Sequence, residues 1–315
     1  ITPRKGVEKR IRVRLRPGSG DETITGTDEP TNTASGVKQP ADSDGNTVRT
    51  FSNQQLKLFD GGTVSMGSSR RDPARQAHEV LRSARLNRPF YLSLKEITNG
   101  EFRQFLANHV SRSDNGQNIN DDNQPVVNVS WNTAALYCNW LSRKDSLDVF
   151  YQIKSGRVLG INPAALGYRL PSEAEWALAA RMQNGEAIKY PWAGKYPPRG
   201  RSGNYADQSA AGVLAQTIPD YNDGFVAAAP VGSFPANLSG IYDMGGNVSE
   251  WVHDFYVAAP QNNSVDPLGP RTGQQHVIKG ASWAHGSDKQ LRYSYRDHGN
   301  DARHDLGFRI ARYAR

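Results

Sequence analysis

Residues 279–299, KGASWAHGSDKQLRYSYRDHG, gather polar and aromatic side chains at unusual density. Trp283, two tyrosines, two histidines, two arginines and two aspartates fall within this one segment. Imidazole and carboxylate groups can bind a metal ion. Tryptophan, tyrosine and arginine are instead the residues that most often anchor interfaces. The segment therefore predicts either a reactive site or a binding surface.

A metal-dependent reaction is the first alternative, because histidines and aspartates recur in and after this segment. The candidate ligands are His285, His298 and His304 with Asp297, Asp301 or Asp305. Their spacing matches no motif with a defined mechanism. We therefore favour a binding surface, which residues 281–305 would form. The predicted ligand-binding residues are Trp283, His285, Asp288, Arg292, Tyr293, Tyr295, Arg296, Asp297 and His298.

Composition excludes several classes of protein. The single cysteine, Cys138, rules out an internal disulfide and a thiolate-rich metal site. The net charge of +7 suggests nucleic-acid binding, but residues 1–16 hold seven Lys or Arg and one acidic residue, Glu8. The rest of the chain therefore has a net charge of only +1, which argues against a basic nucleic-acid-binding face. No apolar run is long enough to span a membrane. The chain begins with Ile rather than Met, and we expect it to be part of a longer chain.

The N-terminal region differs from the rest of the sequence. Residues 10–16, RIRVRLR, alternate as a half-buried strand does, and we interpret 1–16 as the remnant of a preceding small β-domain. Residues 17–50 are rich in Gly, Ser, Thr, Asp and Pro, which predicts a flexible linker. We therefore place the main domain at residues 51–315.

Three helices are predicted within the main domain. Thr98 with Glu101, and Ser172 with Glu175, form capping-box patterns before apolar residues at helical spacing. Ser130 precedes the third helical pattern, in SWNTAALYCNWLSRK. Short strand candidates such as FDGGTVSMG, HVIKGASW and GFRIAR alternate with long Gly, Asn, Asp and Pro loops. Few helices with many short strands predict an α+β fold.

Several phrases occur in a fixed order across this domain: FYLSLKEITNGEFRQF, PVVNVSWNTAALYCNWLS, YRLPSEAEWALAAR, GIYDMGGNVSEWVHDFY, IKGASW and GFRIAR. This series closely resembles the formylglycine-generating enzyme family, the sulfatase-modifying-factor domain, over about residues 55–315. The resemblance implies a variant of the C-type lectin fold, with short antiparallel strands and long irregular loops. It also implies that four tryptophans of these phrases lie in the core and that Arg309 is a buried ion-pair partner; the tryptophans are Trp131, Trp140, Trp176 and Trp251.

The family's enzymes oxidise a cysteine of client sulfatases to formylglycine, and they bind copper through two cysteines in the loop after the phrase matched here by GASW. Those cysteines fall near His285 and Gln290, neither of which is a thiol. Cys138 lies instead in an apolar helical pattern, which is typical of a buried structural residue. We therefore expect no copper and no formylglycine-generating activity.

The resemblance implies structural Ca²⁺, because the family's calcium sites use the oxygen ligands that a hard cation prefers. One predicted site takes the side chains of Asn204 and Asp223 with the carbonyls of Tyr205 and Phe225. The other takes the side chains of Asn247 and Glu250 with the carbonyls of Gly245 and Val248. The alternative for the second site is that Asn247 and Glu250 only hold turns together by hydrogen bonds.

The sequence thus predicts a non-catalytic domain that binds a protein, a peptide or a glycan through residues 281–305. One alternative is a metal-dependent oxidoreductase of the same family with ligands other than cysteine. A second alternative is a variable binding protein of the diversity-generating kind, which carries a hypervariable loop at this position of the same fold. We favour an extracytoplasmic location, periplasmic or at the surface of a bacterial cell.

Overall fold

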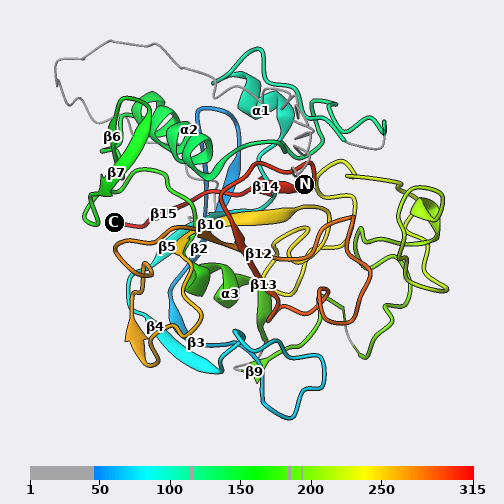
Figure 1. Cartoon of the computed structure of the whole chain (residues 1–315). Coiled ribbons are helices and arrows are strands. Elements are labelled where there is room, and N and C mark those ends of the chain that lie inside the picture. Colours follow the sequence, from blue (N-terminus) through cyan, green and yellow to red (C-terminus); the bar gives the residue numbers. More distant parts are fainter. Residues whose placement is uncertain (1–45, 114–115, 184–185, 193) are drawn as a thin grey trace, which may run out of the picture. The chain divides into compact units, whose positions relative to one another are not determined.

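The computed structural model describes residues 46–113, 116–183, 186–192 and 194–315 (Figure 1). These residues belong to one compact unit. The predicted strand remnant at 1–16 and nearly all of the predicted linker at 17–50 lie outside the described residues. None of the helices in the described ranges combines the length and the apolar character that a membrane crossing requires.

The helices begin where the capping signals place them. The helix α1 (Asn99–Arg103) is capped by Thr98, whose hydroxyl accepts from the Glu101 amide while Glu101 accepts from the Thr98 amide. The helix α3 (Glu173–Arg181) follows Ser172 with the same reciprocal pair to Glu175, and the helix α2 (Trp131–Lys144) follows Ser130, whose hydroxyl accepts from the Thr133 amide. The helix α1 ends at Arg103, before the apolar pattern ends. The chain beyond it is irregular, although Phe105 and Leu106 still pack against the core.

Short strands build most of the fold, which is α+β as predicted. One antiparallel sheet has the order β1 (Thr47–Arg49), β2 (Gln55–Phe59), β5 (Phe90–Ser93) and β15 (Ala311–Tyr313). A second has the order β13 (Arg296–Gly299), β12 (His276–Lys279), β10 (Ser249–Phe255) and β14 (Leu306–Phe308). The third comprises β11 (Ser264–Val265), β4 (Arg82–Leu86) and β3 (Gly62–Met66). Two hairpins, β6 (Tyr151–Lys154) with β7 (Arg157–Ile161) and β8 (Met182–Gln183) with β9 (Glu186–Ala187), complete the strands.

The predicted boundary at residue 51 is wrong, because β1 lies before it. Strand β1 pairs with β2 in antiparallel register, Val48 opposite Leu56. The Val48 side chain is buried in the core, so one apolar residue in a polar segment is enough to dock a three-residue strand. The folded domain therefore includes residues 47–50.

The core lies between α2, α3 and the sheets and is rich in aromatic side chains. Trp131, Trp176 and Trp251 are buried as predicted, and Trp140 is half-buried at the edge of the core, against Phe105 and Tyr137. Indole N–H groups of Trp131 and Trp251 donate to the carbonyls of Val252 and Val129, at 2.8 and 2.9 Å. These bonds hold α2 against β10, the central strand of the second sheet.

Candidate binding pocket and cation sites

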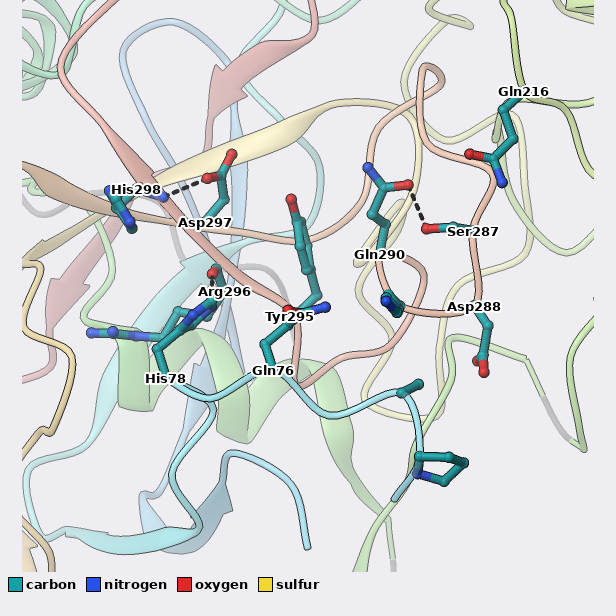
Figure 2. A pocket seen from close by; sticks show the side chains of 13 residues that line it. Gln76, His78, Gln216, Ser287, Asp288, Gln290, Tyr295, Arg296, Asp297 and His298 are labelled. Carbon is teal, nitrogen blue, oxygen red and sulfur yellow. Dashed lines mark hydrogen bonds between the residues drawn. The ribbon is translucent and has the colours of Figure 1, made fainter. Parts of the chain in front are cut away.

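The outer edge of the second sheet borders an open pocket of about 820 Å³ (Figure 2). Three segments line it: the loop 73–78 between β3 and β4, the loop 287–290, and residues 295–298, which include most of β13. Gln216, from a loop that is distant in sequence, also lines the pocket. Five predicted ligand-binding residues line this pocket, namely Asp288, Tyr295, Arg296, Asp297 and His298.

Strand β13 is the last strand of its sheet, and side chains cap its outward backbone groups. The His78 Nε2 lies 2.8 Å from the carbonyl oxygen of Arg296. The amide of His298 donates to the Asp297 carboxylate at 2.8 Å, as the dashed line in Figure 2 shows. The His298 ring lies against Tyr256 at a centroid distance of 3.8 Å, and its Nδ1 has no partner among the described residues. The pocket wall is therefore ordered and polar.

Two buried arginines hold this wall in place. Arg292 makes two bonds to the Glu79 carboxylate, at 2.7 and 2.8 Å, and is 1% exposed. Arg296 pairs with the buried carboxylate of Glu173 at 2.9 Å, and Arg82 pairs with the same carboxylate at 2.8 Å. The polar segment that precedes and forms β13 is thus tied to α3 and to the β3–β4 loop by ion pairs.

Three of the predicted ligand-binding residues are buried and do not line this pocket. Trp283 is 1% exposed and packs with Val127 and Val248, and Tyr293 is 2% exposed in the main core. Arg292 is equally buried. The density of these residue types in the sequence reflects the anchoring of an irregular loop, which has few ladder hydrogen bonds to hold it. Arg296 does line the pocket, although its guanidinium is committed to Glu173.

His285 lies beside the pocket rather than in its wall. Its Nδ1 accepts from the Ser282 amide at 3.1 Å, and its ring meets the Tyr295 ring edge-on at 5.6 Å. Burial lowers the pKa of His285 despite the opposing charge of Asp305, so the ring is neutral at physiological pH. Burial also raises the pKa of Tyr295 to about 12, which keeps its hydroxyl protonated as a donor.

The side chains around the pocket offer hydrogen-bonding groups. Within the described ranges, no three His, Cys, Asp or Glu side chains are grouped so as to hold a metal ion, which removes support from the predicted His and Asp ligand sets. Cys138 is fully buried in α2, as predicted, and burial raises the pKa of its thiol. Sequence reasoning missed the pocket contributions of Gln76, His78 and Gln216, because polar residues of distant loops carry no local signal.

The first predicted calcium site has features that fit a cation. The Asp223 carboxylate is buried and accepts from the Tyr205 and Phe225 amides, both at 2.9 Å. Burial raises the pKa of Asp223 to about 7, and the nearby Asp207 adds to the effect. The side-chain oxygen of Asn204 is buried and has no partner in the described part of the chain. A buried carboxylate and a buried amide oxygen without a partner are both donors of the kind that a hard cation prefers.

The second predicted set does not fit in the same way. The Asn247 side-chain oxygen accepts from the Asn204 side chain and the Ala229 amide, at 3.0 and 2.9 Å. Both carboxylate oxygens of Glu250 accept from Arg309, at 2.7 and 2.8 Å, and one also accepts from the Trp176 indole at 2.8 Å. Arg309 is thus the buried ion-pair partner that the sequence predicted. These contacts match the alternative of a hydrogen-bonded turn.

Two carboxyl groups that sequence reasoning did not single out lie around this turn. Burial raises the pKa of Glu96 well above its usual value, and the charges of Asp243 and Glu250 add to this. Burial likewise raises the pKa of Asp243 to about 6. Glu96 accepts from the Asn247 side chain at 3.2 Å. The carboxyl groups of Glu96, Asp243 and Glu250 thus all lie near the guanidinium of Arg309.

Comparison with known proteins gives a consistent family. Residues 42–314 match the family described as "Sulfatase-modifying factor enzyme 1-like domain". The formylglycine-generating enzyme of Thermomonospora curvata is 35% identical over 178 residues, which are 53% of this chain and 48% of that protein. The inactive C-alpha-formylglycine-generating enzyme 2 of Bos taurus is 32% identical over 194 residues, 59% of this chain and 50% of that protein. The chain therefore spans about half the length of the curated relatives it matches.

Solved structures share the fold. PvdO from Pseudomonas aeruginosa superposes with a TM-score of 0.65 at 25% identity, over 88% of this chain and 100% of that one. Treponema denticola variable protein 1 superposes with a TM-score of 0.64 at 23% identity, over 83% of this chain and 95% of that one. At that identity the second likeness shows the fold alone.

Proposed function

The chain belongs to the family of sulfatase-modifying factor enzyme 1-like domains, and on that premise we propose that it is a non-catalytic domain that binds a peptide, protein or glycan. The ligand occupies the 820 Å³ pocket beside β13. The observation that carries this proposal is the pocket itself, which lies at the predicted loop and presents hydrogen-bonding groups in place of thiols.

The pocket chemistry supports reversible binding. Gln76, Gln216 and Gln290 place amide groups around it, and Tyr295 adds a flat ring with a protonated hydroxyl. Amides and hydroxyls both donate and accept, so they match peptide groups and sugar hydroxyls alike. Lys289 and Asp288 add one charge of each sign. The Gln290 side chain is held by the Ser287 hydroxyl at 2.6 Å, so little of its rotamer freedom is lost on binding.

The absence of a reactive thiol pair supports a non-catalytic role. The positions of the family's catalytic cysteines fall near His285 and Gln290, and the one thiol of the chain is buried in α2. Relatives named inactive C-alpha-formylglycine-generating enzyme 2 share 32% and 31% identity with this chain. A domain of this family that has lost the oxidase chemistry therefore has precedent among its relatives.

We also propose one structural Ca²⁺, held by Asn204 and Asp223 with the carbonyls of Tyr205 and Phe225. The ion would neutralise the buried carboxylate of Asp223 and use the unpartnered oxygen of Asn204. Its role is to tie residues 204–225, which contain no strand, to the rest of the domain. Such a site suits the extracytoplasmic location that we favour, where Ca²⁺ is abundant.

The binding proposal is tested with labelled protein on peptide and glycan arrays, followed by titration of the hits. A Gln76→Ala, Lys289→Ala double variant removes two pocket groups. A Gln152→Ala, Lys154→Ala double variant removes the same groups from the exposed hairpin strand β6. We expect at least about a tenfold loss of affinity for the first variant and none for the second, since a lost hydrogen bond to a charged group costs about 1.5–3 kcal/mol. Equal affinity for the wild type and the pocket variant would contradict the proposed site.

The variable-protein alternative concerns the same surface. The likeness to Treponema denticola variable protein 1 shows that the fold is shared, and the pocket is lined by residues 287–290 and 295–298 of the segment predicted to vary. Sister copies of this sequence from one genome distinguish the two proposals. Differences concentrated at pocket positions such as Lys289 and Gln290, with Arg292 unchanged, favour a variable protein.

A further inference from the structure

A second cavity, of about 360 Å³, shares no lining residue with the pocket beside β13. Its walls come from residues 191–192, 199 and 201–205, from parts of 234–246 and from Tyr293. Tyr293, which was predicted as a ligand-binding residue of the 281–305 loop surface, lines this cavity. The volume lies in the range of small-molecule sites, about 300–1,000 Å³.

Aromatic rings form the apolar part of the walls. Trp192 and Tyr205 meet edge-on with their centroids 5.6 Å apart, and Phe234 and Tyr293 line the same cavity. Trp192 is held in position because it stacks on Tyr190 at 4.8 Å and its indole N–H donates to the Lys195 carbonyl at 3.1 Å. The indole N–H is therefore already used and Tyr190 covers one face of the ring, which leaves the opposite face for apolar contact.

Two exposed arginines give the cavity positive charge. Arg199 and Arg201 both line it, and neither forms an ion pair with any residue that the structure describes. The Arg201 guanidinium lies over the Phe225 and Phe234 rings, at 5.9 and 5.6 Å from their centroids. Guanidinium groups bind carboxylates and phosphates in a planar, two-point geometry. An anionic group is therefore the complement of this side of the cavity.

Two residues of the lining carry hydroxyls without partners. The Ser202 Oγ and the Tyr205 hydroxyl are buried, and within the described ranges neither has a hydrogen-bond partner. An unsatisfied buried group of this kind costs about 1–3 kcal/mol. Asp243 adds a carboxyl group to the lining, one oxygen of which accepts from the Gly232 amide at 2.6 Å. A ligand with several hydroxyls would satisfy these groups.

We propose that this cavity binds a monosaccharide that carries one anionic group, either a carboxylate or a phosphate. The apolar face of the sugar ring packs on Trp192 and Tyr205, and its hydroxyls meet Ser202 and Asp243. The anionic group pairs with Arg199 and Arg201. This site is independent of the ligand proposed for the pocket beside β13, because the two linings share no residue.

The test is calorimetric titration of the whole chain with glucuronate, glucose 6-phosphate, glucose, acetate and inorganic phosphate, in CaCl₂ and again in EGTA. We expect one or both anionic sugars to bind at least tenfold more tightly than glucose, acetate or phosphate. Tighter binding of glucuronate or of glucose 6-phosphate tells which anion the site prefers. The proposal is overturned if no anionic sugar binds at millimolar concentration, or if phosphate alone binds as tightly as glucose 6-phosphate.

Variants locate the binding. The Arg199→Gln, Arg201→Gln double variant should weaken binding of the anionic sugar at least tenfold, and both side chains are exposed, so the fold is preserved. Arg271→Gln, at an exposed arginine outside both linings, should bind as the wild type does. The Gln76→Ala, Lys289→Ala variant should also bind as the wild type does, which separates this site from the first pocket. Unchanged affinity in the double arginine variant would refute the assignment.

Discussion

Replacement of Asp223 by asparagine distinguishes the two calcium sites that the sequence predicted. If Ca²⁺ binds at Asn204 and Asp223, the Asp223→Asn variant loses the only formal charge among the four proposed ligands. In EGTA the variant should melt close to the wild type, because one lost acceptor is offset by removal of a buried, uncompensated charge. Glu250→Gln should behave in the opposite way, since Glu250 balances the buried Arg309 whether or not Ca²⁺ is present.

The expected magnitudes differ enough to measure. Ca²⁺ at about a hundred times its Kd adds roughly 2.7 kcal/mol to the free energy of unfolding. For a domain of this size each kcal/mol shifts the melting temperature by about 2–4 °C, so the wild type should gain roughly 5–10 °C. Loss of one partner from a buried ion pair costs about 3–5 kcal/mol. Glu250→Gln should therefore lower the melting temperature in both buffers and keep the Ca²⁺-dependent rise.

Differential scanning calorimetry of the three proteins in EGTA and in millimolar CaCl₂ decides between these outcomes. Asn204→Ala serves as a second test of the site, because it removes an amide oxygen and no charge. The reasoning is refuted if Asp223→Asn keeps the full Ca²⁺-dependent rise while Glu250→Gln abolishes it. An identical melting temperature of the wild type in both buffers would remove calcium from the description of the domain.

Three further predictions concern the fold and the chemistry. Burial, opposed by the charge of Glu173, lowers the pKa of Lys279 to about 7. Between about pH 7 and 10 the unfolded chain therefore binds one more proton than the folded protein, and the free energy of unfolding rises by at most about 1.4 kcal/mol per pH unit. The Lys279→Met variant should lack this contribution in urea titrations at several pH values. Deletion of residues 1–50 should lower the melting temperature more than deletion of 1–45, because only the first removes β1; equal melting temperatures would show that β1 adds nothing. Aerobic incubation with a cysteine-containing sulfatase peptide should leave the peptide mass unchanged in mass spectrometry, and a mass loss corresponding to formylglycine would contradict the non-catalytic proposal.

The parts of the fold that local sequence determines were predictable. Capping boxes need only residues three apart, so the starts of α1 and α3 at Thr98 and Ser172 could be placed from the sequence. The burial of Arg309 in an ion pair followed from the family resemblance of its phrase, but its partner Glu250 did not. The boundary before β1 could not, because a three-residue strand around Val48 has no periodic pattern of its own.

The candidate site was predictable in location but not in composition. Residues 287–290 and 295–298 line the pocket, within the predicted range 281–305. The opposite wall comes from residues 73–78, more than two hundred positions earlier in the chain. No local sequence pattern indicates that these two segments lie together. Tertiary pairing of distant loops is the part that a single sequence leaves open.

The segment 279–299 is crowded because it performs two tasks at once. An irregular loop has few ladder hydrogen bonds, so side chains must attach it to the domain. Trp283 and Tyr293 do this by burial, and Arg292 by its pair with Glu79. Asp288 and Tyr295, which line the pocket, lie between and after these residues in the sequence. The anchors are the same residue types that mark interfaces, so composition alone cannot separate attachment from contact, and only burial assigns each residue its task.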